Sequence, residues 1–418
     1  MNVKGTRDFL PEEMILRQQV LDKIRCVFDT FGFQPMETPA LESWETLSAK
    51  GAGGEDVFKE CYNFEDIGGR RIGLRYEITV SLARAISENS NLPLPFKAYQ
   101  IGKIWRYGEV SRGRLREFLQ SDADIVGSES PLADAEVIAC AISCFNSLGF
   151  KDFCVRLNSR KVLNEILRLS NISEDRYVDA LRCVDKLDKI SMEEVTKELE
   201  GKGISKASIK KMFEYIMMKG TPENIFKEIG SLDGASELKD IISYLKAMKL
   251  DSKVRIDLSL ARGLDYYTGP IFEVFAEKGI GSIAGGGRYD KMIGLFLGRD
   301  VPATGISLGI ERIMEVMKEK KMIEPLRCNT KVFVIAVNDK VRKDVLGVVQ
   351  ALRQKSIAVD YDLRSRSLSK QLEYASALGI PFAAIVGEKE LKEDSVTLRD
   401  MKTGKEEMVK AKSLPKKF

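Results

Sequence analysis

An arginine, an aspartate and two adjacent phenols stand together in residues 262–268, Arg-Gly-Leu-Asp-Tyr-Tyr-Thr. Three consecutive glycines follow within Ser-Ile-Ala-Gly-Gly-Gly-Arg-Tyr-Asp at 282–290. The guanidinium of Arg262 offers a planar fork of donors that suits a phosphate or a carboxylate. Glycines let the backbone approach a ligand without a Cβ in the way. The pattern predicts a site for an anionic substrate that contains a nucleotide.

A second group of polar residues lies in 97–127, where a strand ends near Arg106 and a loop over 107–113 leads to a return strand from Arg114. Strand side chains alternate between two faces. One face of the return strand then carries Arg114, Arg116, Phe118, Gln120, Asp122 and Asp124. This face is either the floor of a binding site or a solvated surface, and the nearby arginines favour the binding site.

Several kinds of chemistry are excluded. The chain contains no histidine, so it has no imidazole base, no Ser-His-Asp triad and no His-ligated metal. It has no G-x-x-x-x-G-K-[ST] loop, so arginines must hold any ATP. Gly279-x-Gly281-x-x-Ala284 has the spacing of a dinucleotide-binding loop, but the segment is expected to continue into strand and turn rather than open a helix. The pattern therefore argues against a nicotinamide-dependent enzyme.

The elements that must position these residues form two blocks. Strand-rich segments through residue 126 and at 253–258, 271–277 and 301–306 flank an almost wholly helical stretch at about 160–250, which predicts a helical insertion in an α+β domain. Helices are expected at 11–31, 77–87, 133–148 and 307–320. Beyond residue 325, strands at 332–337, 357–361 and 382–386 alternate with helices at 339–354 and 367–378. That alternation predicts a small α/β domain with largely parallel strands.

Composition indicates a cytoplasmic protein. No apolar run reaches the length of a membrane span, and the first residues lack the apolar core of a signal peptide. The net charge is +4, and residues 329–418 hold 18 Lys and Arg against 12 Asp and Glu. This excess fits either contact with a polyanion or an ordinary solvated surface.

The chain resembles the class II aminoacyl-tRNA synthetases, and within them the archaeal and eukaryotic-like histidyl-tRNA synthetases, along nearly its full length. Arg262-Gly-Leu-Asp-Tyr-Tyr is similar to that family's own signature. Lys4-Gly-Thr-Arg-Asp-Phe is similar to the family's start, Pro39 to the proline of motif 1 and Gly305–Arg312 to motif 3. Leu74-Arg-Tyr-Glu-Ile-Thr-Val and Arg112–Asp124 resemble the archaeal and eukaryotic version of the family. The resemblance implies an antiparallel-sheet catalytic domain at 1–325 with the helical insertion, and an α/β anticodon-binding domain at 329–418.

The resemblance also implies the reaction. L-histidine is activated by ATP with Mg2+ to give histidyl-adenylate, and a ribose hydroxyl of the histidine tRNA, tRNA(His), then takes the histidyl group. Phosphoryl-type transfer needs positioning and charge stabilisation more than a protein base, which suits a chain without histidine. A homodimer is implied by the family alone, and no metal ligands are indicated.

Residue roles follow from the same match. Arg106 should hold the α-phosphate and the substrate carboxylate, Arg312 the γ-phosphate, and Arg262 the charge at the α-phosphate. Arg114 should line the ATP side. The residues implied to bind histidine, besides Arg106 and Arg262, are Glu77, Ile78, Thr79 and Gln120 near the α-amino group and Asp124, Tyr266 and Tyr267 around the imidazole.

One position departs from the family pattern. Motif 2 normally has an acidic residue two positions after its arginine, where this chain has Gly108 followed by Glu109. This difference leaves the adenine contacts of the loop open.

Two other functions compete with the synthetase reading. One is the paralogue that regulates ATP phosphoribosyltransferase, which typically lacks the anticodon-binding domain and erodes the 262–267 signature. The other is a glycyl, prolyl or threonyl synthetase, which would share only the tail domain. Histidine-dependent ATP–pyrophosphate exchange separates both from the first reading. The helical block at 160–250 is expected to clamp tRNA rather than to hydrolyse mischarged product.

Overall fold

The computed structural model describes residues 1–49, 58–89, 91–111, 113–261, 266–276, 281–323 and 326–418. The chain divides into two compact units, one of residues 1–7 and 22–322 and the other of residues 8–21 and 323–418. Within the described residues, no helix is long and apolar enough to cross a membrane.

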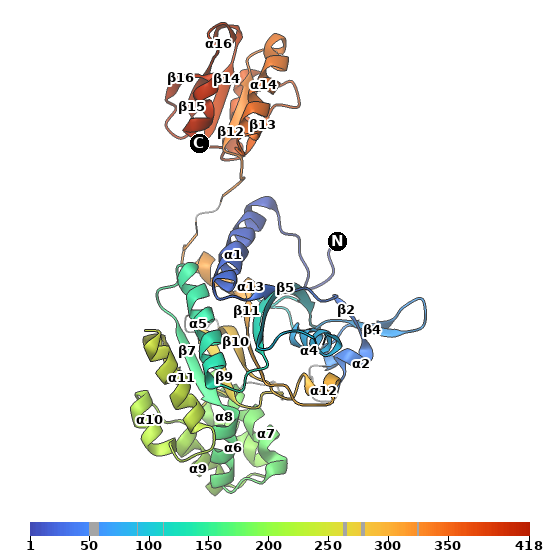
Figure 1. The fold of residues 1–418 in the computed structure, drawn as a ribbon, viewed down its shortest axis with the longest axis vertical. Coiled ribbons are helices and arrows are strands. Elements are labelled where there is room, and N and C mark those ends of the chain that lie inside the picture. Colours follow the sequence, from blue (N-terminus) through green and yellow to red (C-terminus); the bar gives the residue numbers. More distant parts are fainter. Residues whose placement is uncertain (50–57, 90, 112, 262–265, 277–280, 324–325) are drawn as a thin grey trace. The chain divides into compact units, whose positions relative to one another are not determined.

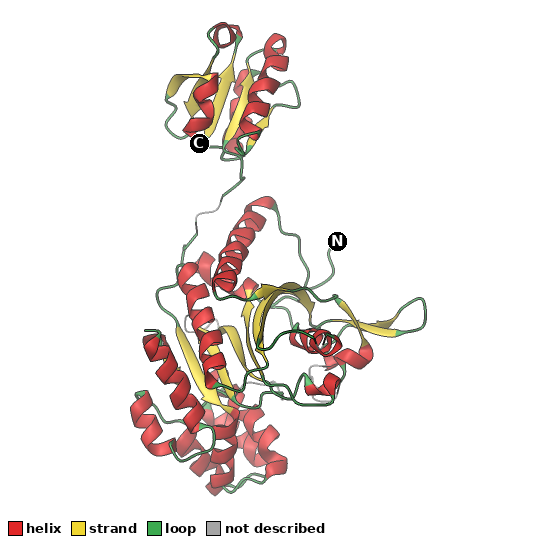
Figure 2. Cartoon of the chain, viewed as in Figure 1, coloured by secondary structure: helices red, strands yellow, loops and turns green. Residues whose placement is uncertain are grey.

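The first unit is built on an eight-stranded sheet, drawn as arrows in Figures 1 and 2. Its strands lie in the order β1-β5-β6-β11-β10-β9-β7-β8. All neighbours are antiparallel except the edge pairs β1–β5 and β7–β8. Their bounds are β1 Gln34–Pro35, β5 Phe96–Trp105, β6 Glu117–Val126, β7 Cys154–Ser159, β8 Val254–Ile256, β9 Pro270–Phe275, β10 Ser282–Arg288 and β11 Ala303–Gly309.

Helices cover this sheet, and a small second sheet lies beside it. Helix α5 begins where Ser130 caps its first turn and Pro131 fixes the first helical φ. The small sheet has the order β2-β4-β3, with strands Leu41–Ser43, Arg71–Leu74 and Asn63–Glu65. The helices outside the insertion are α1 Pro11–Thr30, α2 Trp44–Leu47, α4 Thr79–Glu88, α5 Pro131–Ser147, α12 Gly294–Leu297 and α13 Ile310–Glu319.

A helical insertion leaves the sheet at the end of β7 and returns at β8, which pair in parallel. Its helix α11 packs against α5 and against β7. A complete capping box between Ser191 and Glu194 starts α8. The helices are α6 Arg160–Leu169, α7 Tyr177–Val184, α8 Met192–Gly201, α9 Lys206–Ile216, α10 Pro222–Ile229 and α11 Ala235–Ala247, with short 3-10 turns at 174–176, 185–188 and 251–253.

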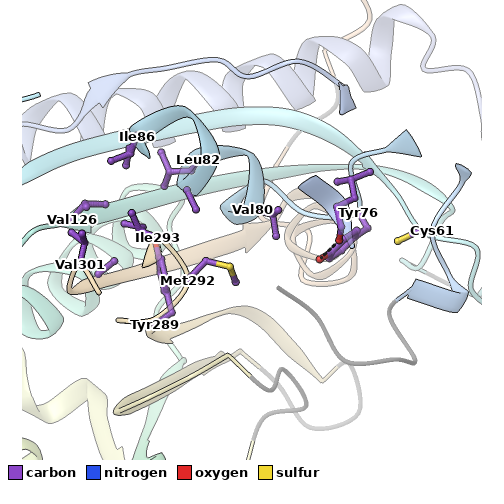
Figure 3. Packing of buried hydrophobic residues seen from close by; sticks show 13 residues of the cluster. Cys61, Tyr76, Val80, Leu82, Ile86, Val126, Tyr289, Met292, Ile293 and Val301 are labelled. Atoms are coloured by element: carbon purple, nitrogen blue, oxygen red, sulfur yellow. Dashed lines mark hydrogen bonds between the residues drawn. The ribbon is translucent and has the colours of Figure 1, made fainter. Parts of the chain in front are cut away.

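An apolar cluster backs the sheet on the side of α4. Figure 3 shows Val80, Leu82 and Ile86 of α4 near Met292 and Ile293, with Val126 and Tyr289 in the same cluster. Burial of these side chains, each stabilising by about 1.5–3 kcal/mol, fixes α4 against the strands. The residues just before α4 are thereby held at the sheet.

The second unit is a five-stranded sheet, β13-β12-β14-β15-β16, with helices on it. β13, β12 and β14 are parallel, as predicted, but β14, β15 and β16 are antiparallel. The elements are β12 Val332–Ala336, α14 Arg342–Arg353, β13 Val359–Tyr361, α15 Leu368–Ala377, β14 Phe382–Val386, α16 Glu388–Lys392, β15 Ser395–Asp400 and β16 Glu406–Lys410.

The predicted fold class, an antiparallel-sheet core with a helical insertion and a C-terminal α/β domain, is confirmed. The predicted start of the return strand was wrong: the strand begins at Glu117 and not at Arg114. Ser111 and Arg114 instead form an isolated bridge, and Gly113 beside it takes a φ of 67°. Glycine accepts this left-handed conformation without the penalty that a side chain adds.

Candidate active site

A cavity of about 500 Å³ opens over the middle of the large sheet. Its floor comes from β6, β9, β10 and β11, and its walls come from the segments before α4, after β5 and at the start of α13. The lining residues that carry chemistry are Glu77, Thr79, Arg106, Arg114, Gln120, Asp122, Asp124, Asp185, Lys189, Tyr266, Tyr267, Glu273, Tyr289, Ser307, Glu311 and Arg312. Most of the residues predicted from sequence therefore meet in one place.

One face of β6 forms part of the floor, as the alternation predicted. Gln120, Asp122 and Asp124 line the cavity together with Phe118. Arg116 does not, because its guanidinium lies 3.8 Å from the Tyr107 ring centroid and its Nε donates to the Gly108 carbonyl at 3.2 Å. The strand begins after Arg116, so the alternation does not extend to it.

Glycines make room for the polar side chains. A Cβ on Gly305 would lie 1.8 Å from Oδ1 of Asp124. A Cβ on Gly287 would lie 2.9 Å from the Tyr267 ring, and one on Gly286 would lie 1.9 Å from the Gly305 carbonyl oxygen. Gly305 of β11 and Gly287 of β10 thus leave room for Asp124 and Tyr267, and Gly286 allows β10 to lie close to the backbone of β11.

Three arginines line the cavity, two from the segment after β5 and one from α13. Arg106 follows β5, and its Nε donates to the Tyr76 carbonyl at 2.8 Å. Arg312 stands in the first turn of α13, which β11 enters directly, and its guanidinium donates to the Ser282 carbonyl at 2.7 Å. Arg114 lies 3.9 Å from Glu60.

The charges of these arginines repel one another. Burial lowers the pKa of Arg312, and the nearby cations Arg114 and Arg106 lower it further, whereas Glu273 raises it. A protein gathers like charges in this way at sites that bind the opposite charge. This part of the cavity is suited to a polyanion such as a triphosphate.

Three buried carboxyls also line the cavity. Burial raises the pKa of Glu77 to about 7; Arg106 opposes this shift, and Asp122 adds to it. Burial also raises the pKa of Asp122 to about 7. The pKa of Asp124 is raised well above its usual range by burial and by the charge of Asp122. A bound cation or hydrogen-bond donor would stabilise the charged form of these carboxyls.

The two adjacent tyrosines both line the cavity. Residues 266 and 267 precede β9 and do not belong to a strand, so the alternation that would separate them does not apply. The Tyr266 hydroxyl donates to Oε2 of Glu77 at 3.3 Å, and its ring lies 4.7 Å from that of Tyr267. The Tyr289 hydroxyl donates to Oδ1 of Asp124 at 2.5 Å.

Two predicted site residues stand apart. Ile78 is fully buried and is not among the residues that line the cavity, because it packs into the interior as the residue before the first turn of α4. The geometry gives no support to a histidine contact by its side chain. Arg262 lies outside the described residues, so its role stays a prediction.

Several lining residues were not assigned a role from sequence. Asp122 stood on the predicted polar face, so alternation alone could have marked it. Glu311 accepts from the backbone N–H of Leu119 at 3.0 Å, which joins α13 to β6. Asp185 and Lys189 come from the insertion, and no local pattern signals their approach to the cavity.

The residues of this cavity fit a magnesium ion only in part. Among the described residues, no group of three or more acidic side chains is placed to hold a metal. Mg2+ is commonly held by one or two carboxylates and by substrate phosphates. Glu273 and Glu311, which line the cavity with Arg312, are carboxylates of that kind.

Comparison with known proteins agrees with this geometry. A family model described as histidyl-tRNA synthetase matches residues 5–313, and an anticodon-binding domain model matches residues 331–418. The chain is 42% identical to a histidine–tRNA ligase of Aeropyrum pernix over 94% of this chain and 92% of the relative. It is 39% identical to that of Thermococcus kodakarensis, over 97% of this chain and 95% of the relative.

Solved structures show the same relationship. The crystal structure of histidyl-tRNA synthetase from Nostoc superposes with a TM-score of 0.88 at 32% identity, covering 100% of this chain and 98% of that one. A Bacillus halodurans structure titled ATP phosphoribosyltransferase regulatory subunit/histidyl-tRNA synthetase has a TM-score of 0.76 over 90% of this chain and 96% of that one; at 21% identity it shows the fold alone. The predicted activity, ATP-dependent ligation of histidine to tRNA, is thereby confirmed. With its arginine-lined cavity, its carboxyl floor and these full-length matches, the chain belongs to the histidyl-tRNA synthetase family.

Proposed function

We propose that histidine and ATP meet in this cavity and react there to form histidyl-adenylate. The observation that carries the proposal is that Arg106 and Arg312 line one cavity with Glu77, Gln120 and Asp124. Guanidinium groups and buried carboxyls together match a substrate pair in which one member is a polyanion and the other is a zwitterion.

The amino acid is held at the carboxyl end. Glu77, Thr79 and Gln120 receive its α-amino group, and Arg106 receives its carboxylate. Oε1 of Glu77 and Oε1 of Gln120 are buried without a hydrogen-bond partner among the described residues, and a buried polar atom of this kind favours a bound donor. Asp124 and Tyr267 hydrogen-bond the imidazole, and Tyr266 forms the wall of the pocket.

The triphosphate is held at the arginine end. Arg106 binds the α-phosphate, Arg312 the γ-phosphate, and Arg114 lines the ATP side. A bound Mg2+ supplies neutralisation of phosphate charge, and Glu273 and Glu311 are the carboxylates that would hold it. Arg262 adds charge stabilisation at the α-phosphate.

Placed in this way, histidine and ATP can react to form the adenylate. An oxygen of the histidine carboxylate forms a bond to the α-phosphorus, and the bond from that phosphorus to the bridging oxygen breaks, so pyrophosphate leaves. The protein contributes alignment and fixed positive charge, which suffice for this class of reaction. A ribose hydroxyl of tRNA(His) then takes the histidyl group.

The rest of the molecule serves the tRNA. Residues 1–325 form the catalytic domain, the insertion at about 160–250 clamps the tRNA, and residues 329–418 bind its anticodon. The enzyme works in the cytoplasm as a homodimer. The relatives' full-length similarity and the anticodon-binding model support this division.

Substitution of Arg106 tests the assignment. Arg106→Ala is expected to lower the rate of histidyl-adenylate formation about 10²–10³-fold, the scale for loss of one preorganised stabilising group. Arg168→Ala, an exposed arginine whose side chain is 61% accessible, is the control. Single-turnover rates that are equal in the two variants would refute the role of Arg106.

A further inference from the structure

Two carboxyls stand side by side at the amino acid end of the cavity. Asp122 and Asp124 are two residues apart on the same face of β6, and they are 3% and 5% exposed. In the register of the sheet, Asp124 lies opposite Gly305 and Asp122 opposite Ser307 of β11. The proposed function uses Asp124 and leaves Asp122 without a task.

Each carboxyl has polar neighbours. Tyr289 donates its hydroxyl to Asp124, and Asp122 lies opposite Ser307 of β11 and Gln100 of β5 in the register of the sheet. Oδ1 of Asp122 is buried, faces no hydrogen-bond partner among the described residues, and belongs to a residue that lines the cavity. Such an atom indicates a donor that arrives with a ligand.

The charged groups around the pair come from several elements. Glu77, from the segment before α4, adds negative charge to the pair. Arg106, after β5, and Arg75, after β4, act on Asp122 only through longer-range attraction. Their Nε atoms donate to backbone carbonyls, that of Arg106 to Tyr76 and that of Arg75 to Lys103. No ion pair joins Asp122 or Asp124 to a lysine or arginine within the described part of the chain.

Buried carboxyls in this situation do not both ionise. Ionisation of one acid makes ionisation of a neighbouring acid more costly when no cation lies between them in a site of low polarity. Burial raises the pKa of both groups, and the charge of Asp122 raises that of Asp124 further. Burial therefore favours the protonated form of these acids in the free protein.

We propose that Asp122 is a specificity-determining residue that makes the enzyme bind histidine with a protonated, imidazolium side chain. The idea rests on the proposed function of the cavity. On binding, the O–H bond of the carboxyl pair breaks and an N–H bond forms on the unprotonated ring nitrogen. The pair becomes two carboxylates, and the ring becomes a cation with two donors. Each ring nitrogen can then donate to an acceptor, and the pair gains the cation that it lacks.

Such a site selects amino acids by the basicity of the side-chain ring as well as by its shape. A ring that cannot accept the proton leaves a carboxyl of the pair without its ionic partner. Sites built on such charged hydrogen bonds reject analogues that lack them far more strongly than apolar pockets do. A triazole ring, which has almost the shape of imidazole but is much less basic, would bind poorly.

The protonation state of the bound ring tests the proposal directly. Histidine labelled with 15N in the ring is bound to the full-length wild-type enzyme at about pH 8, above the ordinary side-chain pKa of about 6.5, and its spectrum is recorded in the solid state. Two protonated ring nitrogens are expected. A neutral ring, with one protonated and one bare nitrogen, would overturn the proposal without any variant being needed.

The variant Asp122→Asn provides a second test of the proposal. It is expected to bind a neutral ring at about pH 8, to weaken histidine binding about 10–100-fold, and to leave ATP binding unchanged. Its preference for histidine over triazolylalanine should fall. Asp175→Asn, at an aspartate whose side chain is 71% accessible, is the control. An imidazolium that persists in Asp122→Asn, or an unchanged preference, would contradict the role of Asp122.

The proposed function of the cavity and the role of Asp122 are tested by different measurements. If the wild-type enzyme shows no histidine-dependent pyrophosphate exchange, the proposed function of the cavity fails. If exchange occurs and the bound ring is neutral, only the role of Asp122 fails.

Discussion

Glu77 is a carboxyl whose ionisation costs the ligand-free protein stability. It is buried, with 4% exposure, and burial raises its pKa to about 7 from the ordinary value of 4.5. A group whose folded pKa exceeds its unfolded pKa binds more protons when folded, so stability falls as pH rises between the two values. From this group alone, the loss occurs between about pH 4.5 and 7.

Removing that charge should therefore stabilise the free protein while it damages binding. Glu77→Gln is expected to raise the free energy of unfolding by roughly 1–3 kcal/mol at pH 8, from 1.36 kcal/mol per pKa unit, and to change it little at pH 5. Denaturant melts at the two pH values measure this difference. Glu129→Gln, at an exposed position, is the control. An equal effect of Glu77→Gln at both pH values would contradict the assignment of its pKa.

At the residue scale, the sequence predicted side chains whose placement depends on a single element. Alternation along one strand put Gln120 and Asp124 on one face, and both line the cavity. Arg106 and Arg312 could not be joined by spacing, because only the packing of α13 beside β6 brings them together. Arg106 and Arg312 were predicted from the resemblance to the synthetase family. The raised pKa values of Asp122 and Asp124 depend on burial by several elements, which no short pattern contains.

Glycines in strands β10 and β11 leave space for side chains of neighbouring elements. Gly305→Ala would place a Cβ 1.8 Å from the Asp124 carboxylate. The backbone cannot move away, since β11 is paired on both edges. The variant is expected to raise the KM for histidine at least about 10-fold, on the scale of a lost hydrogen bond to a charged group, and to affect the KM for ATP much less.

A glycine on the same strand gives the comparison. A Cβ on Gly309 would meet only the Ile283 carbonyl, at 3.5 Å, which is an ordinary contact. Gly309→Ala should therefore cost far less than Gly305→Ala in the KM for histidine. Equal losses would show that the space beside Asp124 is not what Gly305 provides.

The insertion reaches the catalytic cavity through one turn. Asp185 and Lys189 line the cavity, and Asp188 between them receives two hydrogen bonds from Arg156 of β7, at 2.9 and 3.1 Å. Arg156 also lies 3.4 Å from Asp257 and 3.9 Å from the Phe275 ring centroid. The turn is thus anchored to the sheet, so its position at the cavity does not depend on a mobile arm.

A point substitution tests the insertion better than its removal. α11 packs on α5 and α6 begins directly after β7, so deletion of 160–250 would expose core side chains. Lys189→Ala is expected to lower tRNA charging about 10-fold, within the range for one lost hydrogen bond to a charged group, and to spare adenylate formation. Lys202→Ala, on the same insertion, is the control. Equal loss of both reactions in Lys189→Ala would contradict a tRNA role.

At the element scale, the long periodic segments were predicted well and the short ones were not. Helices expected at 11–31 and 133–148 are observed at Pro11–Thr30 and Pro131–Ser147, because capping residues and turns of glycine mark their ends. The hairpin of β15 and β16 was missed, since its strands are short and half exposed. The two-residue strand β1 carries no periodicity at all.

The whole molecule is a synthetase without histidine in its own chain. No imidazole of the protein can take part in the reaction, and the cavity contains carboxyls, arginines and phenols. The same composition makes spectroscopy simple, because a histidine signal from the enzyme in complex with its substrate comes from the substrate alone.

Assembly is a prediction at this scale. The chain mass is 46.9 kDa, and light scattering after size-exclusion chromatography is expected to give twice that value at micromolar concentration. The expectation comes from the family's motif 1, which includes Pro39 in this chain. A mass equal to one chain, together with full activity, would contradict the homodimer.

The central claim is that one cavity holds histidine beside ATP and selects it from all other amino acids. ATP–pyrophosphate exchange by the full-length enzyme, measured with each of the twenty amino acids in turn, tests it most directly. Exchange is expected with histidine alone. Exchange driven equally well by another amino acid, or absence of exchange with histidine in a protein that binds ATP, would contradict the account.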